Sequence, residues 1–185
     1  MEILLIKDDY ILKDIEALGV SALCGIYTDA IKFNSEYRKF CVQNLCGNYG
    51  KSWTCPPNGG TAEEIAKEIL GYSSGVLFEV SGPLRFTVDW KSMMKVANDL
   101  NRVCFAIVDE IIPKIGNGTV FGYGPCKYCK DCAFKTDEPC RYPQKRVRSL
   151  ECACVDVGEL TKECGLSLGG DPDKMSFFGL FVYNP

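Results

Sequence analysis

The sequence predicts an α+β fold (or an α/β fold), in which one compact sheet-and-helix domain over residues 1–185 carries cysteine-rich loops. Residues 75–81 and 174–183 are apolar runs bounded by turn residues, as buried strands are. Between these runs, apolar residues recur at three- and four-residue spacing over residues 89–111, which indicates a long helix. The twelve cysteines gather mainly in two groups outside these elements. Strands and a long helix inside, with cysteines on connecting segments, indicate a mixed domain.

The first elements in chain order are a strand and a capped helix. Residues 1–6 are expected to form a short strand, because their apolar run is followed at once by charged residues. Thr61 is expected to cap a helix that runs to about Leu70. Glu64 stands three residues after Thr61 and completes a capping box.

The later elements are expected on the same kind of evidence. Pro113 and the glycines of residues 116–118 end the long helix. Residues 119–125 form a strand that runs into a glycine-rich bend, and residues 144–154 and 159–165 form short helices. The strand at Lys174–Tyr183 is the last element.

Composition excludes several classes of function. The chain contains no histidine, so Ser-His-Asp and Cys-His catalysis are excluded, as are metal sites that need imidazole. Its formal net charge of −3 argues against a nucleic-acid partner. The first residues lack the pattern of a signal peptide, and the longest apolar run, residues 177–183, is too short to cross a membrane. We therefore expect a cytoplasmic protein with no membrane partner, whose cysteines hold metal instead of forming disulfides. Scattered buried thiols are the alternative.

One group of cysteines has the spacing of an iron–sulfur site. Cys126, Cys129 and Cys132 form a C-x2-C-x2-C pattern, and Cys140 follows. Thiolates at this even spacing suit one face of a [4Fe–4S] cluster, whereas zinc sites more often use two separate C-x2-C pairs. We expect one [4Fe–4S] cluster here, with Cys140 as the fourth ligand and zinc as the alternative metal. Basic residues surround this group and would balance its negative charge: Lys127, Lys130, Lys135, Arg141, Lys145, Arg146 and Arg148.

The other group is less regular. Cys41, Cys46 and Cys55 are spaced C-x4-C-x8-C, and two prolines after Cys55 stiffen the chain there. We expect a second metal centre, most simply a second [4Fe–4S] cluster, beside the first. No fourth thiolate is obvious, so either a distant cysteine completes the site or one iron is open to a small ligand. Free thiols are again the alternative.

Three stretches of the chain resemble a known family. They are residues 46–61, with the pattern CGNYGKSWTCPP followed by GGT, residues 122–132, and residues 139–151. Together they resemble the "predicted metal-binding protein" family (domain of unknown function 2284) of anaerobic bacteria and archaea. The resemblance implies metal binding and implies no established reaction. The family usually has alanine and then glycine where Cys152 and Cys154 stand here.

That difference implies that Cys152 and Cys154 are not ligands common to the family. Seven candidate ligands remain: Cys41, Cys46, Cys55, Cys126, Cys129, Cys132 and Cys140. The other cysteines are expected to be mainly structural: Cys24, Cys104, Cys152, Cys154 and Cys164. Cys152 and Cys154 follow the basic segment, so one of them could supply a thiolate to the open position of the Cys41, Cys46 and Cys55 site.

Three functions fit these observations. The leading hypothesis is an iron–sulfur protein that exchanges electrons with a redox partner, because the chain has no dinucleotide fingerprint and no P-loop of its own. The second is an enzyme that uses an open-site [4Fe–4S] cluster for sulfur or small-substrate chemistry. The third is a zinc-stabilised binding module without turnover.

Overall fold

The structure is a computed structural model that describes residues 10–85, 89–169 and 171–185. A five-stranded sheet forms its centre, in the order β1-β2-β5-β3-β4. Neighbouring strands are antiparallel except β3 and β4, which are parallel. The strands are β1 (Ala22–Tyr27), β2 (Ser74–Pro83), β3 (Thr119–Gly122), β4 (Arg148–Ser149) and β5 (Lys174–Tyr183).

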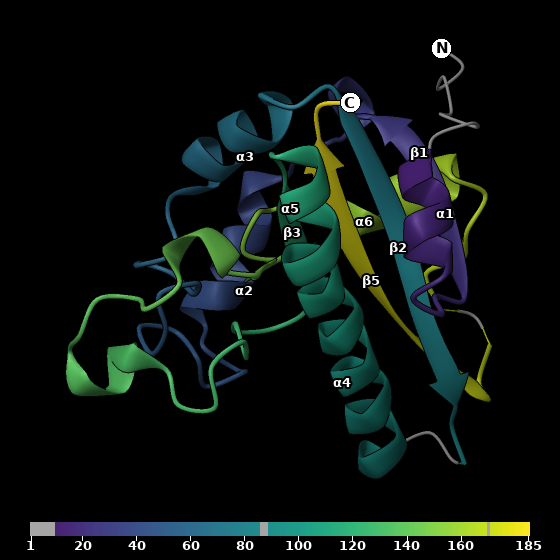
Figure 1. Cartoon of the computed structure of the whole chain (residues 1–185). Helices are drawn as coiled ribbons and strands as arrows, with labels where there is room; N and C mark the ends of the chain where they lie inside the picture. The colour runs from purple at the N-terminus through teal and green to yellow at the C-terminus, as the bar shows by residue number, and fades with distance from the viewer. Residues whose placement is uncertain (1–9, 86–88, 170) are drawn as a thin grey trace.

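Helices cover both faces of this sheet (Figure 1). The α-helices are α1 (Tyr10–Glu16), α2 (Arg38–Val42), α3 (Ala62–Leu70), α4 (Trp90–Ala106), α5 (Ile112–Ile115) and α6 (Val157–Glu163). Apolar residues of α1 and α4 pack on one face, and those of α3 and α6 pack on the other. Side chains alternate along a strand, so Val76 and Phe78 of β2 join the first core while Leu77 joins the second. The α+β prediction is confirmed.

Most of the expected elements are present. The strand expected at residues 75–81 is β2, and the last strand covers the expected Lys174–Tyr183. Thr61 caps α3 with the expected capping box: its hydroxyl accepts from the Glu64 N–H at 3.1 Å, and its own N–H donates to the Glu64 carboxylate at 2.8 Å. The strand expected at residues 1–6 lies outside the described residues.

The long helix continues further than its proline suggested. After α4 the chain forms a π-helical turn at Ile107–Ile111 and then α5. Pro113 lies in the first turn of α5, directly after the π-helical turn, which is the local irregularity that lets the helix continue past a residue without an N–H. Gly116 then ends the helix in the left-handed conformation, with φ of 77°.

The prediction of a helix at residues 144–154 is wrong. Pro143–Lys145 forms a single 3-10 turn, and Arg148–Ser149 pairs with β3 as the short strand β4. Val147 of this segment is buried in the first core, whereas Leu150 and Ala153 are buried in the second, so its apolar residues do not share one helix face. The last short helix, α6, starts earlier than expected because the Asp156 side chain accepts from the Glu159 N–H at 3.0 Å and caps it.

Candidate metal centre

Both cysteine groups lie on the same side of the sheet, away from β1. Figure 1 shows α2 and the loop after it close to the long connection between β3 and β4. The first group comes from α2 and that loop, and the second group comes from the β3–β4 connection. Segments about eighty residues apart in the sequence are thus brought together, as the expectation of two neighbouring sites requires.

The four cysteines of the second group line one pocket. Cys126, Cys129, Cys132 and Cys140 are all partly buried and all contribute to its wall. No Asp or Glu is among the described residues that line it, so the available charged donors are thiolates. In the described part of the chain, no three Cys, Asp or Glu side chains are arranged so that they could hold a metal ion. The thiols therefore share a pocket without converging on one point.

The loop of the first group forms part of that same pocket. The Cys126 N–H donates to the Thr54 hydroxyl at 3.0 Å, and Thr54 is only 2% exposed. The Ser52 and Thr54 hydroxyls are hydrogen-bonded to each other at 2.9 Å. Beside them, the Trp53 indole N–H donates to the Glu138 carbonyl at 3.0 Å, and the Trp53 ring meets Phe134 edge-on at a centroid distance of 5.0 Å. These contacts hold the two cysteine segments against each other.

Electrostatic interactions between thiols also cross from one group to the other. Burial raises the pKa of Cys126, and the nearby Cys129 and Cys140 thiols raise it further. Burial likewise raises the pKa of Cys55, and both Cys46 and Cys126 act in the same direction. Cys55 is therefore close to a thiol of its own group and to a thiol of the second group.

The first group is held differently from the second. Cys41 lies in α2 and not on a loop, Cys46 is exposed in the loop that follows, and Cys55 precedes the cis Pro56–Pro57 bond. The Cys46 thiol raises the pKa of both Cys41 and Cys55, so the three thiols of this group act on one another electrostatically. After Cys55 the chain turns so tightly that a Cβ added at Gly59 would lie 2.6 Å from the Thr54 carbonyl oxygen, so only glycine fits there.

Ten cysteines are free thiols and two are not. Cys24 of β1 and Cys164 at the end of α6 form a disulfide, with their Cα atoms 5.9 Å apart. The expectation that no cysteine pairs is therefore wrong at these two positions. Cys104 lies on the buried face of α4, and burial raises its pKa to about 12. Both are structural roles, as expected for these cysteines.

Cys152 and Cys154 lie in the turn between β4 and α6, beside Arg38 of α2. Burial raises the pKa of Cys152 to about 11, although the Arg38 guanidinium opposes that rise. Cys154 has a positive φ of 57°, a conformation that glycine adopts most easily. Arg38, Ser52 and Thr54 were not singled out from the sequence. The three-residue spacing of Arg38 and Cys41 is the sequence feature that could have indicated a role for Arg38 beside a cysteine.

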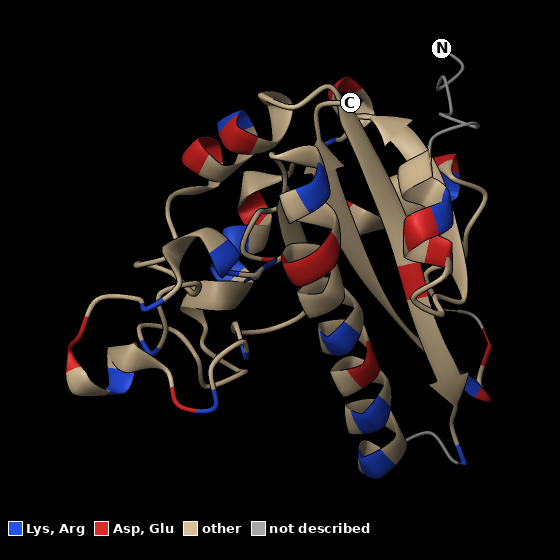
Figure 2. Cartoon of the chain, viewed as in Figure 1, with Lys and Arg blue, Asp and Glu red and all other residues tan. Residues whose placement is uncertain are grey.

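The basic residues near the second group are mostly engaged in contacts within the chain. Lys145 pairs with Asp109 at 2.7 Å, Arg148 pairs with Glu68, and Arg141 donates to the Asp131 carbonyl at 2.7 Å. Figure 2 shows acidic positions interspersed with basic ones along these loops. Much of the basic cluster therefore holds the β3–β4 connection in place.

In the described ranges, no helix has both the length and the apolar character needed to cross a membrane. No curated protein and no solved structure is significantly similar to the chain. The model of one family, "Predicted metal-binding protein (DUF2284)", matches residues 24–182. This match spans both cysteine groups and most of the sheet, and it agrees with the resemblance carried by the three motifs. The chain belongs to the DUF2284 family of predicted metal-binding proteins.

Proposed function

We propose that this metal-binding protein holds iron–sulfur clusters and exchanges electrons with a redox partner in the cytoplasm. The observation that carries the proposal is the pocket lined by Cys126, Cys129, Cys132 and Cys140 next to the loop of the first group. Thiolates are the usual ligands of iron–sulfur clusters, whereas Mg²⁺ and Ca²⁺ prefer oxygen. The donor chemistry therefore fits iron–sulfur, with zinc as the competing metal.

The four thiols of the pocket would hold one [4Fe–4S] cluster, and Cys41, Cys46 and Cys55 would hold a second. The sulfurs do not converge in the structure, so cluster binding would require the cysteine side chains to rotate about χ1. When bound, such a cluster supplies one-electron transfer. The chain itself would supply the ligands, the cover and the balancing charge.

Neighbouring side chains suit these tasks. Trp53 and Ala133 give the pocket apolar walls, which limit the access of water. Arg141, Lys145 and Arg146 also line it, and their charges would offset those of four thiolates. Cations near a cluster raise its reduction potential.

A partner protein would have to approach the β3–β4 connection. Lys127 and Lys130 have no ion pair within the described ranges, so they are the basic residues best placed to attract an acidic electron carrier. Attraction of this kind steers encounter and weakens as salt is added. A Lys127→Gln, Lys130→Gln variant should therefore accept electrons from an acidic ferredoxin more slowly at low salt than the wild type does.

The test of the proposal is the metal and sulfide content of the full chain purified without oxygen. We expect about four irons and four acid-labile sulfides for each cluster held, with a brown colour and a paramagnetic resonance signal on reduction. Cys129→Ser should remove one cluster and leave the other. Stoichiometric zinc without labile sulfide would instead establish the zinc-stabilised module, and a colourless chain that is stable without metal would end the proposal.

A further inference from the structure

Cys152 is a buried thiol that the proposed function does not use. It is 2% exposed and belongs to the turn between β4 and α6. Its N–H donates to the Ser149 hydroxyl at 3.0 Å, which fixes the turn. Its sulfur lies within electrostatic range of the Cys41 and Cys55 thiols, two members of the group that lacks a fourth ligand.

Arg38 links the Cys152 thiol to the chain segments on which Cys41 and Cys55 lie. One guanidinium nitrogen lies 3.6 Å from the Cys152 sulfur, and the other donates to the Gly60 carbonyl at 3.0 Å. Arg38 also starts α2, so it stands one helical turn before Cys41. Arg38, which belongs to the helix that carries Cys41, thus contacts both Cys152 and the segment that follows Cys55.

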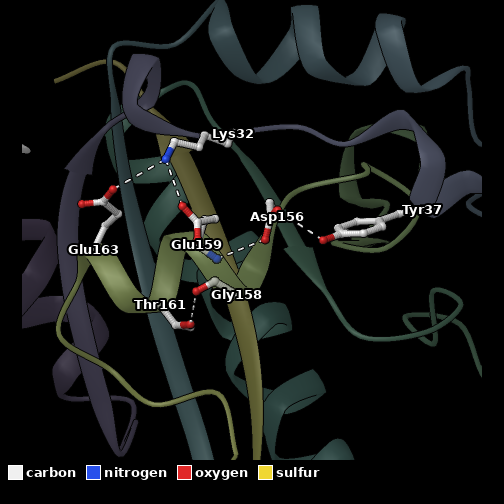
Figure 3. A network of polar contacts seen from close by, with 7 residues as sticks. All are labelled: Lys32, Tyr37, Asp156, Gly158, Glu159, Thr161 and Glu163. Carbon is white, nitrogen blue, oxygen red and sulfur yellow. Dashed lines mark hydrogen bonds and ion pairs between the residues drawn. The ribbon is translucent and has the colours of Figure 1, made fainter.

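The two segments that carry Cys41 and Cys152 are tied together by polar contacts (Figure 3). The Tyr37 hydroxyl, next to Arg38, donates to the Asp156 carboxylate at 3.2 Å, and Lys32 pairs with Glu159 at 3.1 Å. The backbone adds a hydrogen bond from the Asn34 N–H to the Cys154 carbonyl at 2.8 Å. The position of Cys152 relative to α2 is therefore set by the fold and not by a loose loop.

We propose that Cys152 supplies the fourth thiolate of the centre formed by Cys41, Cys46 and Cys55, with Arg38 donating a hydrogen bond to its sulfur. This inference rests on the proposed function, since it needs a metal centre at the first group. Four thiolates around a cluster leave net negative charge, and the Arg38 guanidinium would offset part of it within the buried site. A closed centre of this kind suits electron relay, because no iron remains open to a substrate.

Cys154 is the obvious competitor, and the structure favours Cys152. The Arg38 guanidinium acts on both thiols and lies 3.6 Å from the Cys152 sulfur. Cys154 raises the pKa of Cys41, whereas both Cys41 and Cys55 raise the pKa of Cys152. Cys154 also occupies a left-handed backbone position, at which glycine is an unstrained replacement. Cys154→Gly is therefore a matched control that removes a neighbouring thiol.

The experiment compares wild type, Cys152→Ala, Cys154→Gly and Cys46→Ser, each purified without oxygen as the full chain. Iron and labile sulfide are counted, and resonance spectra of the reduced protein are recorded with and without added 2-mercaptoethanol. We expect wild type and Cys154→Gly to be alike and insensitive to the thiol. Cys152→Ala should either lose about half of the iron, as Cys46→Ser does, or keep a cluster whose signal now changes with the thiol.

The result that overturns the inference is a Cys152→Ala protein with wild-type iron content and a signal insensitive to the thiol. The cluster of the second group serves as an internal reference, because its unchanged signal shows that the variant has folded. Absence of iron and sulfide from the wild type would refute the proposed function itself. Two clusters in the wild type that are unaffected in Cys152→Ala would refute only the role of Cys152.

Discussion

Replacing Thr54 with valine removes one hydroxyl from the contact between the two cysteine segments. That hydroxyl accepts the Cys126 N–H at 3.0 Å and is hydrogen-bonded to the Ser52 hydroxyl at 2.9 Å. Valine has nearly the same shape as threonine, so packing is preserved while both contacts are lost. Ser52 keeps its hydrogen bond from the N–H of residue 54 at 3.0 Å, so the Cys126 N–H is the group left without its partner.

The expected cost follows from the burial of these groups. A buried donor without a partner costs roughly 1–3 kcal/mol. Thr54 is buried but Cys126 is only partly so, and water can reach some of the freed N–H. We therefore expect a loss of about 1–2 kcal/mol in the free energy of unfolding. Because the freed group begins the C-x2-C-x2-C loop, we also expect a chelator to remove metal from this variant faster than from the wild type.

The assay is urea unfolding followed by circular dichroism, with chelator-induced metal release measured in parallel. Thr161→Val is the matched control. Thr161 is also buried, but its hydroxyl donates within its own helix α6, to the Val157 carbonyl at 2.8 Å and to the Gly158 carbonyl at 3.0 Å. We expect this control to lose less than about 1 kcal/mol and to release metal at the wild-type rate. Equal unfolding and release in the two variants would refute the reasoning.

Three other tests address separate parts of the chain. Thr61→Ala should lower the free energy of unfolding by about 1 kcal/mol in urea titrations, because it removes the capping box of α3, whereas Thr61→Ser should retain most of it. Cys104→Ala should leave iron and sulfide content unchanged by elemental analysis, since this thiol of α4 is fully buried in the first core; loss of a cluster would show that it is a ligand. The Lys145 ammonium holds the pKa of Asp109 below its usual range, so the stabilisation from this pair is present above the unfolded pKa and is lost as pH falls through the folded pKa. Acid titration of the metal-free protein should show a smaller fall in stability between about pH 5 and pH 3 for Asp109→Asn than for the wild type, and parallel curves would contradict this.

Local patterns predicted most of the fold because the elements concerned are long or clearly capped. The helix α4 carries an apolar stripe over several turns, and Thr61 marks the start of α3 by its side chain alone. The prediction for residues 144–154 is wrong because this segment is short and its structure depends on contacts with distant residues. Its apolar residues are spaced as in a helix, but two cores and the pairing of Arg148–Ser149 with β3 determine its structure. Such contacts between distant residues leave no periodic signal in the segment itself.

In the candidate site, too, local features could be predicted from the sequence and contacts between distant residues could not. The spacing of Cys126, Cys129 and Cys132 was readable because one short loop supplies all of them. The hydrogen bond from Cys126 to Thr54 joins residues far apart in the sequence, and so does the contact of Arg38 with Cys152. Both depend on how the loops pack on the sheet, and one sequence cannot show that packing. The seven candidate ligands remain a prediction until metal is measured.

The contacts around Cys55 bear on how the two groups would act together. Thr54, directly before Cys55, accepts the hydrogen bond from Cys126, while Gly60, shortly after it, accepts the one from Arg38. Cys55 is therefore held from both sides, by the second group on one side and by the helix of Cys41 on the other. A ligand that orders one part of such an assembly reduces the ordering cost for the next, and metal bound at either group would thereby favour binding at the other. The same two hydrogen bonds fix the first group against the second, and a fixed relative position would suit the electron transfer that we propose between them.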